Sequence, residues 1–179
     1  MDDEPSPLLL KLVALGDWGV GKTSCIKRYT DNIFNADYKS TIGTAFSLKT
    51  LDYTNSSGRR FRIRLVLWDL AGQPSYNELR RRYMAGAMMG LIVYDVTRPP
   101  TFMTAHEWFM KFVAVCPTAN VALVANKIDM ETRQVPIQAG QMLAEWLKVR
   151  YFEVSAKTGE NIEEVFTDLV FRLPEVQNA

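Results

Sequence analysis

A glycine-rich segment near the N-terminus constrains the fold more than any other feature of this sequence. It reads Gly16-Asp17-Trp18-Gly19-Val20-Gly21-Lys22-Thr23, and it joins an apolar run at 8–15 to a helix-like segment at 23–31. In this context the pattern is typical of a loop that binds phosphate groups. Successive backbone N–H groups of such a loop converge on phosphate oxygens, and the helix that follows adds the positive end of its dipole. The sequence therefore predicts a phosphate site at the end of a buried strand.

The polar side chains of this segment suit a nucleotide bound with magnesium. Lys22 can place a positive charge on the outer phosphates and support catalysis, and the Thr23 hydroxyl can coordinate Mg²⁺. The loop by itself does not choose between ATP and GTP. The nucleotide-binding residues that we predict in this segment are Asp17, Trp18, Gly19, Val20, Gly21, Lys22, Thr23 and Ser24.

Apolar, β-rich runs alternate with helical patterns along the rest of the chain. Strands are expected at 8–15, 88–96, 120–125 and 151–154, with a hairpin at 44–53 and 60–69 around the turn residues 55–58, and helices at 23–31, 101–115, 136–149 and 161–172. This order predicts an α/β fold with a six-stranded, mainly parallel sheet, one antiparallel strand and helices on both faces. We expect one domain over residues 8–174, a flexible N-terminus at 1–7 and the start of a C-terminal tail at 175–179.

A second motif follows the apolar strand at 120–125 and points to the base. The Asp129 carboxylate in Asn126-Lys127-Ile128-Asp129 can accept hydrogen bonds from the N1–H and 2-amino groups of guanine, a pair that adenine lacks. Asn126 can bridge the base and the phosphate loop, and the Lys127 stem can lie along the ring. After the last strand, Ser155-Ala156-Lys157 can place the Ala156 N–H near the guanine oxygen and Lys157 on the base.

Two segments can contact the third phosphate or its Mg²⁺. They are the end of the strand at 60–69 and the aperiodic loop at 32–43. Asp69 can hold Mg²⁺ through water, the Gly72 N–H can reach the terminal phosphate, and Gln73 can orient an attacking water. Thr41 can add a second hydroxyl to Mg²⁺. Both segments would then be ordered by that phosphate and released on its loss.

With these motifs in order over about residues 8–174, the sequence resembles the Ras superfamily of small GTPases and, within it, the Rab branch. Ser40-Thr41-Ile42-Gly43-Thr44-Ala45-Phe46 and the segment 67–73 look like the two Rab switches, and 26–29 and 46–49 look most like the Rabs of lysosome-related organelles. The resemblance implies a G domain that hydrolyses GTP slowly and switches between GTP- and GDP-bound forms in vesicle trafficking. It also implies an exchange factor, a GTPase-activating protein and trafficking effectors as partners. The positions matching the family's effector-reading aromatic triad are Phe46, Trp68 and Tyr83, and Phe34 matches the aromatic that packs on the base.

The chain departs from the family pattern at three places, which leave a second interpretation open. Thr44-Ala45 replaces the usual Val-Asp, Pro74 follows Gln73 where Glu is usual, and Trp18 occupies a position that is small in most relatives. An indole there would crowd the third phosphate, so a nucleotide-binding module with little hydrolysis is the alternative. A phosphoryl-transfer kinase would need a lid, for which the chain has no spare segment.

Net charge and cysteine content limit the kinds of partner and the cellular location that we expect. A net charge of +1 over 179 residues argues against a general electrostatic attraction to nucleic acid or to an anionic membrane. We expect a cytoplasmic monomer that would lie peripherally on endomembranes only if a lipidated tail lies beyond this chain. Cys25 and Cys116 are interpreted as reduced thiols, and Trp108 and Trp146 as packing residues.

Overall fold

A six-stranded sheet forms the centre of the fold in the computed structural model. The structure describes residues 7–36, 43–54, 60–70 and 77–178, and at 77–80 it describes only the backbone. The strands lie in the order β2-β3-β1-β4-β5-β6, and only the β2–β3 pair is antiparallel. The strands are β1 (Leu8–Leu15), β2 (Thr44–Thr54), β3 (Arg60–Leu70), β4 (Met89–Asp95), β5 (Asn120–Asn126) and β6 (Arg150–Val154). The predicted fold class is confirmed.

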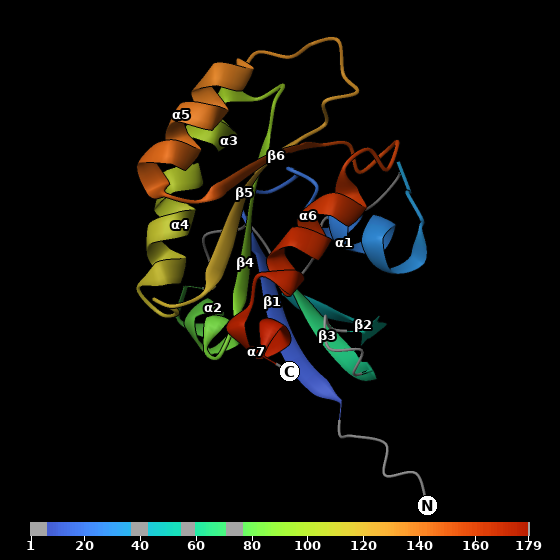
Figure 1. The fold of residues 1–179 in the computed structure, drawn as a ribbon. Coiled ribbons are helices and arrows are strands. Elements are labelled where there is room, and N and C mark those ends of the chain that lie inside the picture. The colour runs from blue at the N-terminus through green and yellow to red at the C-terminus, as the bar shows by residue number, and fades with distance from the viewer. Residues whose placement is uncertain (1–6, 37–42, 55–59, 71–76, 179) are drawn as a thin grey trace, which may run out of the picture.

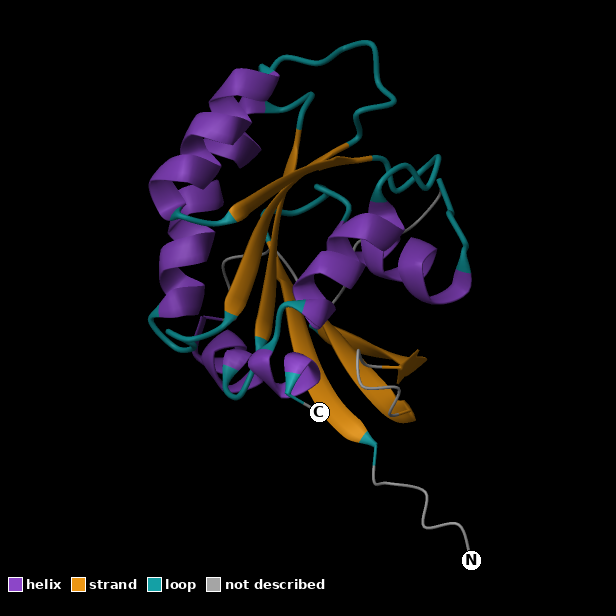
Figure 2. Cartoon of the chain, viewed as in Figure 1, coloured by secondary structure: helices purple, strands orange, loops and turns teal. Residues whose placement is uncertain are grey.

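Helices cover both faces of this sheet (Figures 1 and 2). They are α1 (Lys22–Asp31), α2 (Asn77–Met84), α3 (Pro99–Met103), α4 (Ala105–Val113), α5 (Ile137–Leu147), α6 (Ile162–Phe171) and α7 (Pro174–Gln177). Helices α1 and α6 pack together on one face, while α3, α4 and α5 lie on the other. No described helix has the length and apolar character needed to span a membrane.

Strand β1 shows why the apolar run at 8–15 is continuous. Leu10, Leu12 and Ala14 belong to the core cluster under α1 and α6, whereas Val13 and Leu15 belong to the cluster under α4 and α5. All five are fully buried. A strand covered on both faces needs apolar residues at consecutive positions, and its end delivers the phosphate loop to the edge of the sheet.

The single helix predicted at 101–115 is wrong: two helices, α3 and α4, meet at Thr104. The first begins at Pro99, because proline favours the first turn, where its missing N–H is not needed. The Thr104 hydroxyl donates to the Asp17 carboxylate at 2.7 Å, so the break brings a hydroxyl against the phosphate loop. Helix α7 also adds a turn after the predicted end at Arg172, with Val176 buried.

Candidate functional site

Two glycines of the phosphate loop are fixed by close approaches to other strands. Gly16 has φ of +140°, and a Cβ there would lie 2.2 Å from the Val93 carbonyl oxygen on β4. Gly21 has φ of +99°, and a Cβ there would lie 2.2 Å from the Asn126 Nδ2. Both values lie in the region that side chains rarely adopt. The loop is therefore tightly packed against the ends of β4 and β5.

The Lys22 ammonium lies inside the loop. It is buried and donates at 2.9 Å to the carbonyl oxygens of both Gly16 and Asp17. Next to it, the Thr23 hydroxyl donates to Oδ2 of Asp69, whose carboxylate is buried at the end of β3. A hydroxyl and a carboxylate that meet beside a phosphate loop are oxygen ligands of the kind that Mg²⁺ takes, either directly or through water. The residues present thus fit the predicted magnesium site.

Asn126 joins the base motif to the phosphate loop. Its Nδ2 donates to the Val20 carbonyl oxygen at 2.8 Å, and its Oδ1 accepts from the Ala156 N–H at 3.1 Å. The side chain is 1% exposed, so these two bonds form away from water and fix three segments relative to one another. The predicted bridge from Asn126 to the loop is present, and the Ala156 amide donates to this side chain.

Asp129 lies beside the other predicted base residues. Ser155, which is fully buried, donates from Oγ to the Asp129 carboxylate at 2.6 Å, and Lys157 Nζ lies 3.8 Å from its second oxygen. Arg28, which the sequence did not mark as functional, holds the same segment. Its Nε donates to the Ala156 carbonyl at 3.0 Å and its Nη2 to the Lys157 carbonyl. These contacts fix the orientation of a carboxylate suited to guanine.

A buried carboxylate that sequence reasoning missed lies between the two motifs. Asp95 is 0% exposed, and its Oδ2 pairs with Lys127 Nζ at 2.6 Å and with Arg98 Nε at 3.0 Å. Its Oδ1 accepts from both the backbone N–H and the hydroxyl of Thr97. Burial alone would raise the pKa of Asp95, but the hydrogen bonds from Lys127 and Thr97 outweigh it and hold that pKa below its usual value.

Arg98 extends this cluster to the phosphate loop. Its Nη2 donates to the Trp18 carbonyl oxygen at 2.8 Å and lies 3.3 Å from the position of a Cβ on Gly19. The Trp18 side chain itself is 56% exposed. One carboxylate, Asp95, therefore connects the lysine of the base motif to the backbone of the phosphate loop.

Asp17 anchors the loop to α4 and to the residue before it. Its carboxylate accepts from Trp108 Nε1 on α4 at 2.7 Å and from the Thr104 hydroxyl at 2.7 Å. Trp108 is buried as predicted, but it also holds the loop, which its apolar neighbours in the sequence did not indicate. Trp146, predicted to pack, is instead 69% exposed.

The structure describes some of the remaining predicted site residues and not others. Phe34 is half-buried against the core cluster under α1, Ser24 is half-buried on α1, and the Val20 side chain is fully buried. Thr41, Gly72 and Gln73 lie outside the described residues. The described part of the site is thus the loop, the base motifs and one side of the magnesium position.

The three predicted effector aromatics form a continuous row on β2, β3 and α2. The ring centroids of Phe46 and Trp68 are 5.8 Å apart, and those of Trp68 and Tyr83 are 5.3 Å apart. Phe46 is 64% exposed. Lys11 lies over the Trp68 ring, 5.0 Å from its centroid, and donates to the Ala85 carbonyl.

Comparison with known proteins agrees with this geometry. A family model described as the Ras family matches residues 11–175. The chain belongs to the Ras family. It is 37% identical to Ras-related protein Rab-27B of Rattus norvegicus over 183 aligned positions, which cover 96% of this chain and 84% of the relative. It is also 37% identical to Ras-related protein SEC4 of Saccharomyces cerevisiae, over 90% of this chain and 73% of the relative, and 39% identical to Ras-related protein RABE1d of Arabidopsis thaliana, over 90% and 74%.

Family membership confirms the predicted Rab-type small GTPase, a GTP-hydrolysing switch of the class that acts in vesicle trafficking. Proteins of this family bind GTP or GDP with Mg²⁺ and interact with exchange factors, activating proteins and effectors. The alternative of a nucleotide-binding module with little hydrolysis gains no support from these matches.

Proposed function

We propose that GTP and GDP bind along the edge of the sheet where β1, β4, β5 and β6 end. The observation that carries this proposal is the position of Asn126, which hydrogen-bonds the phosphate loop with one side-chain atom and the segment at Ala156 with the other. This places the phosphate loop and the Asp129 carboxylate in one packed unit. In the proposal Lys22 contacts the outer phosphates, while Thr23, Thr41 and Asp69 hold Mg²⁺, with Asp69 acting through water.

Base selection gives the sharpest test of this arrangement. Replacing Asp129 by Asn turns a two-acceptor carboxylate into an amide with an acceptor and a donor, which suits xanthine better than guanine because xanthine carries an oxygen at C2. Asp129→Asn should weaken GDP binding by roughly two or more orders of magnitude and should bind xanthosine diphosphate more tightly than GDP. Competition against a fluorescent nucleotide measures both affinities. Unchanged GDP affinity in this variant would contradict the proposed base site.

For hydrolysis we propose that Gln73 positions the attacking water while Lys22 and Mg²⁺ stabilise charge on the phosphates. The step transfers the terminal phosphoryl group from GTP to water and yields GDP and phosphate. Phosphate release in a single turnover should be slower in Gln73→Leu, with GTP affinity retained. Equal release rates in the two proteins would remove Gln73 from this role.

We also propose that the row formed by Phe46, Trp68 and Tyr83 binds trafficking effectors, and that the exchange factor and activating protein act through the two switches. Support comes from the contiguity of the three rings and from the exposure of Phe46. Such a protein would work in the cytoplasm and, where the native chain carries a lipidated tail, on the surface of endomembranes.

A further inference from the structure

A pocket of about 630 Å³ lies at the end of the β2–β3 hairpin, at the opposite edge of the sheet from the nucleotide site. Pro7, directly before β1, and the arginines of the first half of β3 line it. The phosphate loop follows the other end of β1, and eight residues of strand span roughly 26 Å. Helix α7 lies at the same end of the molecule as the pocket (Figure 1).

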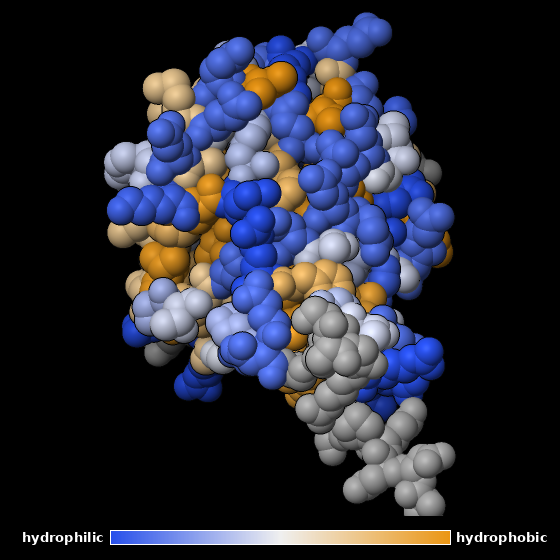
Figure 3. Space-filling model, in the orientation of Figure 1, coloured by the Kyte–Doolittle hydropathy of each residue, from blue (hydrophilic) through white to orange (hydrophobic). Residues whose placement is uncertain are grey.

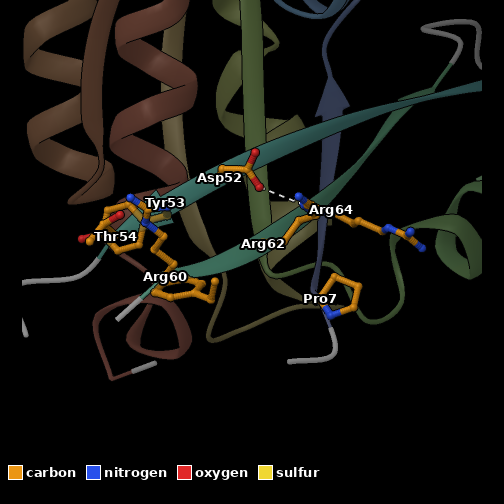
Figure 4. A pocket seen from close by; sticks show the side chains of 8 residues that line it. Pro7, Asp52, Tyr53, Thr54, Arg60, Arg62 and Arg64 are labelled. Carbon is orange, nitrogen blue, oxygen red and sulfur yellow. Dashed lines mark hydrogen bonds and ion pairs between the residues drawn. The ribbon is translucent and has the colours of Figure 1, made fainter. Parts of the chain in front are cut away.

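Three arginines supply most of the polar lining. Arg60, Arg62 and Arg64 occupy alternate positions of β3 and are all exposed, whereas Ile63 and Leu65 between and beyond them are buried. Side chains two residues apart on a strand project from the same face, about 7 Å from each other. Figure 4 shows the three arginines along this strand with Asp52 on the neighbouring strand. Figure 3 shows strongly hydrophilic surface over this end of the hairpin.

The charges of this arginine pocket are not balanced by the residues that the structure describes. Asp52 pairs with Arg62, with 2.8 Å between Oδ1 and Nε. Among described residues, no carboxylate forms an ion pair with Arg60 or Arg64. The pocket therefore concentrates positive charge on a chain whose net charge is only +1.

The shape and the residue type narrow the ligand. A guanidinium binds phosphate through two parallel N–H···O bonds, so arginines favour this group. The volume suits a small molecule rather than a single ion. Tyr53 and Phe61 also line the pocket, but their rings pair with each other, with centroids 4.9 Å apart, and pack against the core cluster on the face opposite the arginines.

We propose that this arginine pocket binds a small ligand that carries two or more phosphate groups, either free in solution or as the headgroup of a lipid. Arg60 and Arg64 contact separate phosphates, and Arg62 remains paired with Asp52. The site is independent of the nucleotide site, because it lies at the opposite ends of the strands.

Binding is measured on the full chain loaded with Mg²⁺ and GDP, so that the phosphate loop is already occupied. One arm titrates inositol trisphosphate by calorimetry. The other arm measures sedimentation with phosphatidylcholine vesicles that contain, or lack, a small fraction of phosphatidylinositol bisphosphate. The test variant is Arg60→Gln/Arg64→Gln. The control is Arg150→Gln/Arg172→Gln, which removes the same charge from two exposed arginines that pair with Asp168.

The test variant should bind about 100-fold more weakly, roughly tenfold for each arginine, while the control variant should bind like the wild type. Binding in either arm with this difference supports the pocket, and the arm that responds tells whether the headgroup must be free or in a membrane. No binding in either arm, or equal losses in both variants, would overturn the proposal. So would binding that appears only in Asp2→Asn/Asp3→Asn/Glu4→Gln, because the chain's own acidic N-terminus would then occupy the pocket.

Discussion

The Asp95 carboxylate offers the most informative perturbation of this molecule. In Asp95→Asn, the amide oxygen can still accept from Thr97, but an NH₂ group replaces the oxygen that pairs with both Lys127 and Arg98. Two cations then face a donor and lose their shared counter-ion. Because Lys127 belongs to the base motif and Arg98 holds the Trp18 carbonyl, both halves of the nucleotide site lose a support.

The expected magnitude follows from burial. A hydrogen bond to a charged group contributes about 1.5–3 kcal/mol, and the variant loses two of them. The carboxylate is fully buried, but the side chains of Lys127 and Arg98 are 35% and 37% exposed, so solvent screens both pairs and the sum is reduced by about half. We expect the free energy of unfolding to fall by about 1.5–3 kcal/mol. If about half of this is lost from the nucleotide-bound state, GDP release accelerates roughly three- to tenfold.

The assay follows release of a fluorescent GDP analogue after addition of excess GDP, together with urea unfolding of the same samples. Asp168→Asn is the matched control. Asp168 is also an aspartate between two arginines, with its side chain 14% exposed, but it lies on α6 away from the nucleotide motifs. The Asp168→Asn variant should be less stable to urea but should release GDP at the wild-type rate. If Asp95→Asn releases GDP within twofold of the wild type, or if both variants accelerate release equally, the connection through Asp95 is refuted.

Three further outcomes follow from the same contacts. Trp108→Phe keeps an aromatic ring but removes the N–H that donates to Asp17, so it should lower the free energy of unfolding in urea by about 1–2 kcal/mol and speed GDP release. An unchanged release rate would separate this bond from nucleotide binding. Because the folded pKa of Asp95 lies below its usual 3.8, its stabilisation is present above about pH 4 and lost as the pH falls further, so the stability difference between wild type and Asp95→Asn should shrink in acid titrations. Gly21→Ala would place a methyl group against Asn126, at a φ of +99°, and should abolish tight GDP binding in a calorimetric titration, whereas Gly86→Ala, at a position with no neighbour within 4 Å, should retain it.

The sequence predicted the features that depend on local pattern. The apolar run at 8–15 could be recognised as a strand buried on both faces, and the glycine spacing after it fixed the phosphate loop. The hairpin followed from alternation on either side of a turn. The order of strands and helices then predicted the sheet and the edge at which the motifs meet. Each of these inferences needed only neighbouring residues and general rules of chain connection.

The contacts missed in the sequence join residues far apart along the chain. The bond from Thr104 to Asp17 spans 87 positions, and the one from Arg98 to Trp18 spans 80. Thr104 in a helical pattern gave no sign that the helix would break there. Asp95, the last residue of β4, and Arg98 gave no sign of their role in the sequence. The burial of that aspartate depends on β4 lying between β1 and β5.

The geometry at Asp95 explains why residues that do not reach the nucleotide should still affect it. Lys127 and Arg98 pair with the same oxygen, so a shift in the position of either side chain changes the electrostatic environment of the other. The Trp18 carbonyl and the Asp17 carboxylate give the adjoining part of the loop two further attachments, both to the segment after β4. Because Asn126 fixes the same loop from β5 through a buried bond, opening the loop requires several hydrogen bonds to break together. The affinity for the nucleotide therefore depends on this connected set of hydrogen bonds and ion pairs. Removal of one side chain from the set should release nucleotide faster while most of the fold remains intact.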